Sequence, residues 1–337
     1  MTPMRIPFDM KAVYLCRHIL QRQNLFSSLE AKARRKTEEQ YRDCPSLTPV
    51  EIERVIDINH FDFDRFLKDG GFDTPFLIKG VFSSNAVQWD QLREAYGDSI
   101  VPVHPDAKLG ESWQYEIVRE MTLRDAMRAM EQGAPISVVS SSQVFVDHGQ
   151  LLETMKPRVL SEVFGAHFVR HEMFVAGAGT GSAFHCAVGG NFFHMVCGRK
   201  RWLLVKPSDS FAMYPTIGRN TRSAYFGSPI NSESYEQDQQ KLFPLYSKVR
   251  KYLVTLEPGD VLFVPSWWWH EVKNLEPSVG FPFRSWIRGT NPFFLLLTIM
   301  SINGIKNLPR ALAGRITKSP SWMMRDGIPR ESFARRA

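Results

Sequence analysis

The sequence predicts a mainly β protein with helical flanks, and three features support this. Between residues 172 and 286, short apolar stretches alternate with glycine- and proline-containing turns, which is typical of a β-sandwich or barrel. Before residue 75 the chain is rich in charged helix formers, and helical texture returns after residue 290. We therefore expect a helical extension over 1–75, a β domain over 76–290, and a helical region with a basic tail over 291–337.

The composition is that of a globular protein large enough to bury a core. Of the 337 residues, 43% are hydrophobic and 23% charged, which argues against a disordered or fibrous chain. The formal net charge of +7 is spread along the sequence, and no basic stripe is interleaved with aromatic residues, so we expect no nucleic-acid partner. The four cysteines form no CxxC pair, which argues against a structural zinc site and fits a reducing compartment.

Neither a signal peptide nor a membrane span is expected. The first 20 residues lack an apolar core followed by a small-residue cleavage site. The most apolar run, residues 293–300, is far shorter than the ~20 residues that cross a bilayer. These features predict a soluble, cytoplasmic protein, and the C-terminal helical region is a candidate contact between two copies of the chain.

Local patterns predict the elements of the first half. Thr48, Pro49 and Glu51 form a capping signal, which predicts a helix over 52–58. Thr122 is expected to cap a helix that ends near residue 132. The remaining expected elements are a surface helix over 28–41 and strands over 75–82, 101–104 and 136–140.

The second half contains a long polar stretch between predicted strands. Residues 208–248 are rich in Ser, Asn, Tyr and Gln. Long connections within compact domains are often functional. We expect this stretch to be an insertion that shapes the mouth of a substrate site.

Two histidines lie in motifs that favour metal binding. His185 follows a glycine-rich turn in GTGSAFHCAVGGNFF, and His270 ends PGDVLFVPSWWWH. The second motif has a tight turn, a short strand and a tryptophan cluster. A histidine held rigidly at the end of a barrel strand and shielded by aromatic residues suits a metal ligand.

These motifs resemble the jumonji-C, cupin-like 2-oxoglutarate oxygenases. The family pattern is roughly GTxTPLHxD, NxF, GxKRW and PGDxLFxPxxWWH. The positions that match it are Gly179, Thr180, Ser182, His185, Asn191, Phe193, Gly198, Lys200, Arg201, Trp202, Pro258, Gly259, Asp260, Pro265, Trp268, Trp269 and His270. The resemblance implies a double-stranded β-helix (jelly-roll) that binds Fe(II), 2-oxoglutarate and O2 at one mouth.

The resemblance also implies roles for individual residues. His185 and His270 would be the iron ligands, since imidazole suits ferrous iron. Lys200 would pair with the distal carboxylate of 2-oxoglutarate, and Ser182 and Asn191 would hydrogen-bond the same cosubstrate. Further polar candidates near the cosubstrate are Arg284 and Ser285 on the last strand.

The sequence departs from the family at the third iron ligand. The family has His-x-Asp, whereas here Ala187 follows His185 and Cys186. In one interpretation, chloride or bromide replaces the carboxylate, as in 2-oxoglutarate halogenases, and the enzyme halogenates an unactivated C–H bond. In a second, the protein is a hydroxylase whose iron is held by two histidines, with water or an acid such as Asp147 or Glu271. In a third, it is a non-catalytic binding module.

The substrate and the neighbouring side chains are less constrained. The resemblance favours an amino-acid, peptide or protein substrate. Cys186 is expected to face away from the metal because it alternates with His185 along the strand. His194 is expected to point outward, and Trp267, Trp268 and Trp269 are expected to pack in the core.

Overall fold

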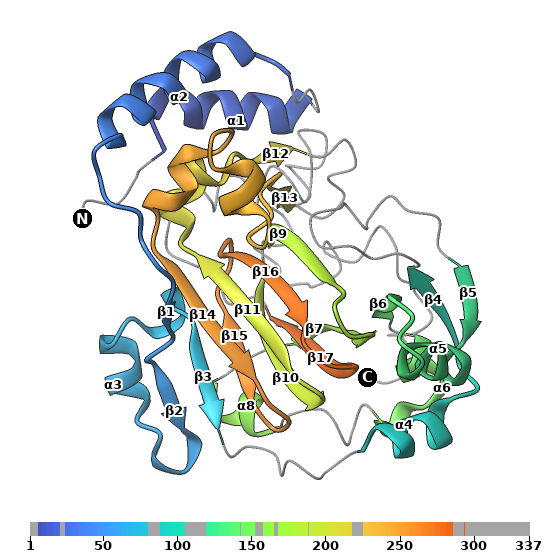
Figure 1. The fold of residues 1–337 in the computed structure, drawn as a ribbon. Helices are drawn as coiled ribbons and strands as arrows, with labels where there is room; N and C mark the ends of the chain where they lie inside the picture. The colour runs from blue at the N-terminus through green and yellow to red at the C-terminus, as the bar shows by residue number, and fades with distance from the viewer. Residues whose placement is uncertain are drawn as a thin grey trace.

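The computed structural model describes residues 6–20, 24–79, 88–104, 119–141, 143–151, 158–164, 168–187, 189–217, 225–285 and 293. Two β-sheets face each other in this part of the chain, with helices outside them (Figure 1). This arrangement confirms the mainly β prediction and is consistent with a double-stranded β-helix.

The first sheet contains seven strands in the order β1-β14-β11-β16-β9-β13-β12. Its central pairs, β11 with β14 and β16 and then β16 with β9, are all antiparallel. The strand bounds are β1 Val50–Glu51, β9 Gly181–Ala187, β11 Lys200–Val205, β12 Thr216–Ile217, β13 Tyr225–Gly227, β14 Lys251–Leu256 and β16 Trp269–Asn274.

The second sheet has the order β2-β3-β15-β10-β17-β8-β6-β4-β5, with β7 also paired to β17. The β10–β17 pair forms its centre. The strand bounds are β2 Val55–Asp57, β3 Phe76–Lys79, β4 Ile100–His104, β5 Arg119–Thr122, β6 Ser137–Ser141, β7 Phe168–His171, β8 Met173–Ala176, β10 Gly190–Cys197, β15 Val261–Val264 and β17 Ser278–Ser285.

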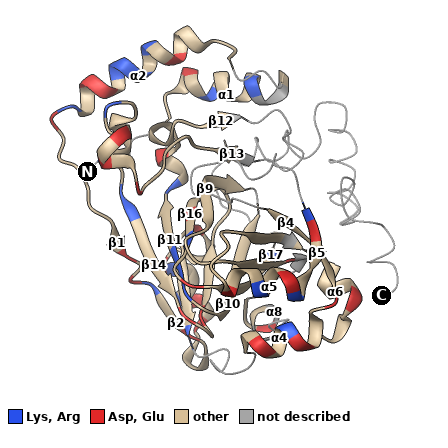
Figure 2. Ribbon diagram, turned by 45° about the vertical axis from the view of Figure 1, so that its right-hand side comes forward, with Lys and Arg blue, Asp and Glu red and all other residues tan. Residues whose placement is uncertain are grey.

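The helices lie outside the sheets. Thr122 caps α5 through its side chain, as predicted, because its hydroxyl accepts a hydrogen bond from the Asp125 amide. Both charge signs occur along α2, which has no buried residue (Figure 2). The α-helix bounds are α1 Phe8–Leu20, α2 Ser27–Tyr41, α3 Phe63–Lys68, α4 Trp89–Tyr96, α5 Leu123–Glu131, α6 Gln143–Asp147 and α8 Arg158–Phe164. The shorter helical turns are η1 Ile58–His60, η2 Gly71–Asp73, η4 Pro207–Met213, η5 Tyr235–Gln239 and η6 Pro244–Lys248.

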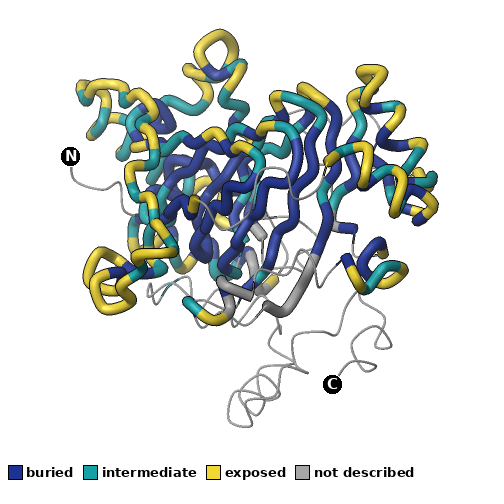
Figure 3. The backbone as a smooth tube through the Cα atoms, turned by 90° about the horizontal axis from the view of Figure 1, so that it is seen from below, coloured by how far each residue is buried: buried dark blue, intermediate teal, exposed yellow. Residues whose placement is uncertain are grey.

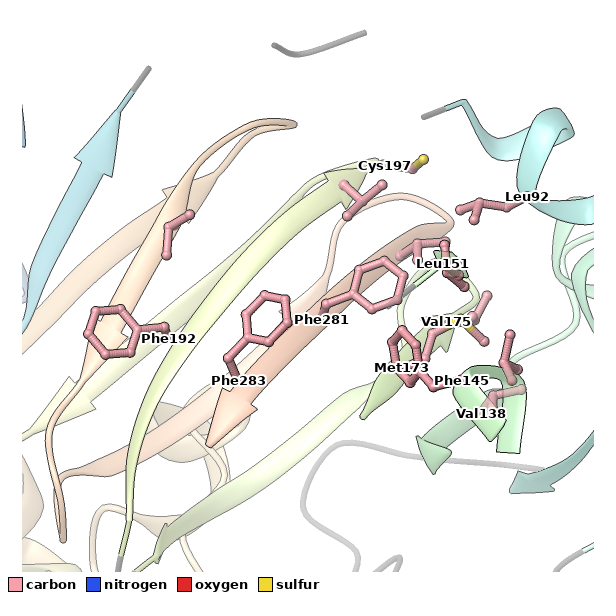
Figure 4. Close-up of a cluster of buried hydrophobic side chains, with 14 of the residues drawn as sticks. Leu92, Val138, Phe145, Leu151, Met173, Val175, Phe192, Cys197, Phe281 and Phe283 are labelled. Atoms are coloured by element: carbon pink, nitrogen blue, oxygen red, sulfur yellow. The ribbon is translucent and has the colours of Figure 1, made fainter. Parts of the chain in front are cut away.

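Strand alternation divides the buried side chains into three layers. One cluster lies between the sheets and includes Phe193 and Trp202. A second covers the outside of the second sheet, where Phe281 of β17 contacts Phe145 of α6 and Phe283 lies between Phe281 and Phe192 (Figure 4). A third joins the outside of the first sheet to α1 and includes Phe184. The central strands are therefore buried on both faces, while exposure is concentrated in the peripheral helices and loops (Figure 3).

The helix predicted over 52–58 is wrong. Val50 and Val55 start short strands that extend the first and second sheets, so the segment before residue 75 is not purely helical. The backbone amide of Ile52 donates to the carbonyl of Leu253. These sheet-edge hydrogen bonds outweigh the local capping signal at Thr48, because tertiary pairing overrides a weak local propensity.

The polar stretch 208–248 is more structured than an insertion loop. It contributes β13, which pairs with β9 so that Gly227 lies opposite His185. Residues 291–337, including the proposed dimer contact, lie outside the described residues except for position 293. Among the described helices, none combines the length and apolarity that crossing a membrane requires.

Candidate metal and cosubstrate site

The inner face of the first sheet presents polar side chains in successive cross-strand rows. In the first row His185 on β9 lies opposite His270 on β16. Two residues further along β16 the register pairs Val272 with both Ser182 and Trp202. Cross-strand partners share a face of the sheet, as do residues two apart on a strand, so these rows face the space between the sheets.

The two histidine rings lie close together. Their centroids are 4.1 Å apart with an interplanar angle of 56°. His270 also stacks on Trp202, with centroids 5.6 Å apart and 27° between the planes. The prediction that His185 and His270 converge at one place in the barrel is therefore met by the geometry.

Backbone hydrogen bonds set the orientation of both rings. Nδ1 of His185 lies 2.8 Å from the carbonyl oxygen of Ala183, and Nδ1 of His270 lies 3.0 Å from that of Trp268. A carbonyl oxygen can only accept, so Nδ1 donates and the lone pair is on Nε2. This arrangement is typical of metal-binding histidines, whose second ring nitrogen is held by a backbone or side-chain acceptor.

Both imidazoles are neutral at physiological pH. Burial lowers the pKa of His185 to about 4, and the positive charge of Arg284 contributes to the lowering. Burial lowers the pKa of His270 well below its usual value, with further contributions from His185 and Arg284. A neutral imidazole is the form that binds a metal.

Lys200 lies in the third row, at greater depth in the barrel. Its ammonium donates to Oδ1 of Asn274, 2.7 Å away, and lies 5.7 Å from the ring centroid of Phe193. Asn274 in turn donates from Nδ2 to the carbonyl and hydroxyl oxygens of Thr180, at 3.1 and 2.9 Å. Lys200 is 3% exposed, and it forms no ion pair within the described ranges. Burial lowers its pKa to about 7.

A β-bulge keeps Ser182 on the side of the histidines. Simple alternation from His185 would place Ser182 on the opposite face of β9. The register with β16 shifts between His270 and Val272, so that Val272 pairs with Ser182. The extra residue reverses the alternation and returns Ser182 to the inner face.

The opposite sheet supplies Asn191. It lies on β10 opposite Val264 and Arg284, is 3% exposed, and shares the inner face with Phe193. Its Oδ1 is buried without a partner among the described residues, and so is Nε1 of Trp202. Buried polar atoms are nearly always hydrogen-bonded, so these two point to a polar ligand between the sheets.

The position beside His185 where the family has its third iron ligand is occupied by Ala187, which is partly exposed. Within the described ranges, no cluster of three or more His, Cys, Asp or Glu side chains has metal-binding geometry. Asp147, one candidate acid, is exposed on α6 and accepts from Gln143, which contradicts a ligand role. Glu271, the other candidate acid, alternates with His270 along β16 and accepts from the Ser232 amide, so it faces away from the histidine pair.

Several neighbouring side chains are structural, as predicted. Cys186 belongs to the cluster outside the first sheet. His194 is buried on β10 opposite Phe281, on the outer side of the second sheet. Trp268 and Trp269 pack in the core and donate to the Asp73 carbonyl and the Ser210 hydroxyl, respectively.

Arg284 is the polar residue of the last strand that faces the site. It lies opposite Asn191 and alternates with Phe283, which points into the outer cluster. Its Nε lies 3.3 Å from the carboxylate of buried Glu172. Ser285, the other candidate, is on the opposite face and donates to the Gly190 carbonyl.

Sequence reasoning missed Asn274 and Glu172. Asn274 could have been found, because a residue four positions after His270 shares its face of the strand. Glu172 precedes a strand and has no local signal; only the fold brings it to Arg284.

Comparison with known proteins agrees with the fold described above. A model of the cupin-like domain family matches residues 71–286. HSPB1-associated protein 1 of Mus musculus is 44% identical over 99 residues, which is 29% of this chain and 20% of that protein. Jumonji C domain-containing protein 5 of Drosophila melanogaster is 33% identical over 106 residues, covering 32% and 25%. tRNA wybutosine-synthesizing protein 5 of Mus musculus is 35% identical over 96 residues, covering 28% and 27%.

The matched segments span only about a fifth to a quarter of those relatives. The family match, in contrast, extends over more than half of this chain and includes both histidines and all the inner-face strands described above. The chain therefore belongs to the cupin-like domain family, within the jumonji-C-type superfamily.

Proposed function

We propose that the protein is an Fe(II)/2-oxoglutarate-dependent enzyme of the halogenase type, acting on a C–H bond of an amino-acid or peptidyl substrate. The main support is the pair of neutral imidazoles with both Nδ1 atoms bonded to backbone carbonyls, next to Ala187. His185 and His270 would hold the iron through Nε2. Chloride or bromide would take the place of the carboxylate that Ala187 lacks.

The cosubstrate fits the remaining polar groups. A buried ammonium with an amide partner but no carboxylate in the described ranges is costly, and a bound carboxylate would compensate it. Lys200 would therefore take the distal carboxylate of 2-oxoglutarate, while Asn191 and Ser182 hydrogen-bond the rest. About four residues along the strands, roughly 13 Å, separate the Lys200 row from the histidine row. The lysine side chain covers part of this span and the five-carbon dicarboxylate the rest.

When bound, the iron, 2-oxoglutarate and O2 supply C–H oxidation, with overall conversion of substrate, 2-oxoglutarate, O2, halide and one proton to halogenated substrate, succinate, CO2 and water. The chain's own contribution is positioning and exclusion of water. Trp202 and Phe193, whose ring centroids are 4.9 Å apart, form an apolar wall beside His270. Such a wall limits the entry of water to the side of the site that faces the barrel mouth.

An anaerobic titration with Fe(II) and 2-oxoglutarate tests this proposal. We expect a weak visible charge-transfer band that shifts when chloride is replaced by bromide. Ala187→Asp should remove the halide shift while keeping the band, because the new carboxylate fills the third-ligand position. Ala187→Gly is the matched control and should behave like the wild type.

Two results would contradict the proposal. A wild-type protein that gives no band would favour a non-catalytic binding module. A band that is insensitive to halide in the wild type would favour hydroxylation with iron held by two histidines and water.

A further inference from the structure

Positive charge dominates the described charged side chains that face the space between the sheets. Lys200 and Arg284 are cations there, and Glu172 is the acid that contacts Arg284. Histidine binds a metal as a neutral ligand, so His185 and His270 add no charge to a loaded site. A divalent metal with dianionic 2-oxoglutarate would leave one positive charge uncompensated, so this interior favours one more anion.

The guanidinium of Arg284 faces the inside of the barrel. Arg284 pairs with Asn191, and Pro282 pairs with Phe193, which lies in the cluster between the sheets. Cross-strand partners share a face, so Arg284 points toward the same space as Asn191. Its side chain is 26% exposed, so an ion from solvent can reach it.

Glu172 holds the guanidinium from one side. Its carboxylate is 2% exposed and contacts Nε of Arg284 at 3.3 Å. The hydrogen bond to Glu172 uses Nε of Arg284, so the donors of Nη1 and Nη2 lie outside that bond. These two nitrogens form the edge of the guanidinium that suits a second anion, since arginine binds anions through a fixed fork of donors.

We propose that Arg284, oriented by Glu172, forms with the metal site a binding site for one monovalent anion, and that metal and anion binding are therefore coupled. The inference rests on the proposed function for the metal at the histidine pair. The anion is either a halide ion or the carboxylate of a substrate. Arg284 acts as a positioning residue for this anion.

The coupling has an electrostatic origin. A dication beside a guanidinium is repelled, and the repulsion is strong because the site is largely shielded from water. An anion between the two charges converts this repulsion into two attractions. By linkage, each ligand then raises the affinity for the other by the same factor.

The test measures Mn(II) affinity by the electron paramagnetic resonance signal of the free ion, at fixed 2-oxoglutarate and constant ionic strength set with a bulky sulfonate salt. Chloride, bromide and formate are varied in separate arms. Between the anion dissociation constants of the metal-bound and the metal-free protein, wild-type Mn(II) affinity should rise by up to about tenfold for each tenfold increase in anion, and it should level off above the higher constant. A rise with halide alone identifies a halide ion, and an equal rise with formate identifies a carboxylate; both support the site.

The variants isolate the role of Arg284. Glu172→Gln with Arg284→Gln removes both charges, so that no buried carboxylate is left unpaired. We expect this double variant to bind Mn(II) with no dependence on anion concentration, and Arg284→Lys to keep part of the dependence. Arg199→Gln, which removes an exposed ion pair with Glu276, is the control and should match the wild type.

Two outcomes would overturn the inference. If the double variant keeps the wild-type anion dependence, the metal site stands and Arg284 does not hold the anion. If the wild type binds no Mn(II) in any salt, the proposed metal site itself fails, and the inference with it. Circular dichroism of each variant shows whether it has folded.

Discussion

Replacing Lys200 with methionine is expected to stabilise the protein while removing its cosubstrate site. Lys200 is buried, and its ammonium donates only to Asn274 within the described ranges. Burial lowers its pKa from 10.5 to about 7. Methionine has a similar shape and needs no charge or hydrogen bond in this interior.

The magnitude follows from the pKa. Each pKa unit corresponds to about 1.4 kcal/mol, so at pH 7 the buried Lys200 costs roughly 4 kcal/mol of folding free energy. Loss of the hydrogen bond to Asn274 offsets about 1 kcal/mol. Oδ1 of Asn274 keeps a donor, the Ser278 hydroxyl at 3.1 Å. The net expectation is a gain of about 3 kcal/mol for Lys200→Met, which is roughly 4 °C in Tm for a chain of this length.

The sign of the pH dependence provides a second check. The folded pKa of Lys200 lies below the unfolded value, so its unfavourable contribution is absent above about pH 10.5 and grows as the pH falls toward 7. Wild-type stability should therefore rise between pH 7 and 10 relative to that of Lys200→Met.

Urea unfolding of the ligand-free proteins measures both effects, and thermal shifts with Mn(II) and 2-oxoglutarate report binding. We expect Lys200→Met to lose the ligand-induced shift. A destabilised Lys200→Met at pH 7 would refute the reasoning, because it would mean that Lys200 stabilises the fold even without a bound carboxylate.

Three further predictions concern the same site. Calorimetric affinity for 2-oxoglutarate should fall about tenfold per pH unit above 7, since the dicarboxylate binds protonated Lys200; a flat profile between pH 7 and 9 would contradict this. His270→Ala should abolish Mn(II) binding measured by equilibrium dialysis, whereas His194→Ala, outside the second sheet, should lower stability and leave binding intact. Asn274→Leu should weaken 2-oxoglutarate binding and destabilise the protein by about 1–3 kcal/mol in urea, because Thr180 and Lys200 lose their shared partner; unchanged binding would remove Asn274 from the site.

The sequence alone indicated the fold class and the two histidines. Alternating apolar residues and turn signals are local patterns, and strand existence follows from them. The motifs around His185 and His270 have local turn chemistry that suits a rigid ligand, and the absence of an acid at Ala187 is visible without a structure. Capping of α5 by Thr122 is similarly local and was predicted correctly.

Only the tertiary structure decided which residues share the inner face. The bulge that returns Ser182 to the histidine side depends on how β9 and β16 pair, and the extended course of residues 50–57 depends on available sheet edges. The contact of Glu172 with Arg284 joins residues 112 positions apart. Such contacts arise from strand register and barrel closure. Both depend on many weak interactions across the chain, so no single segment of the sequence predicts them.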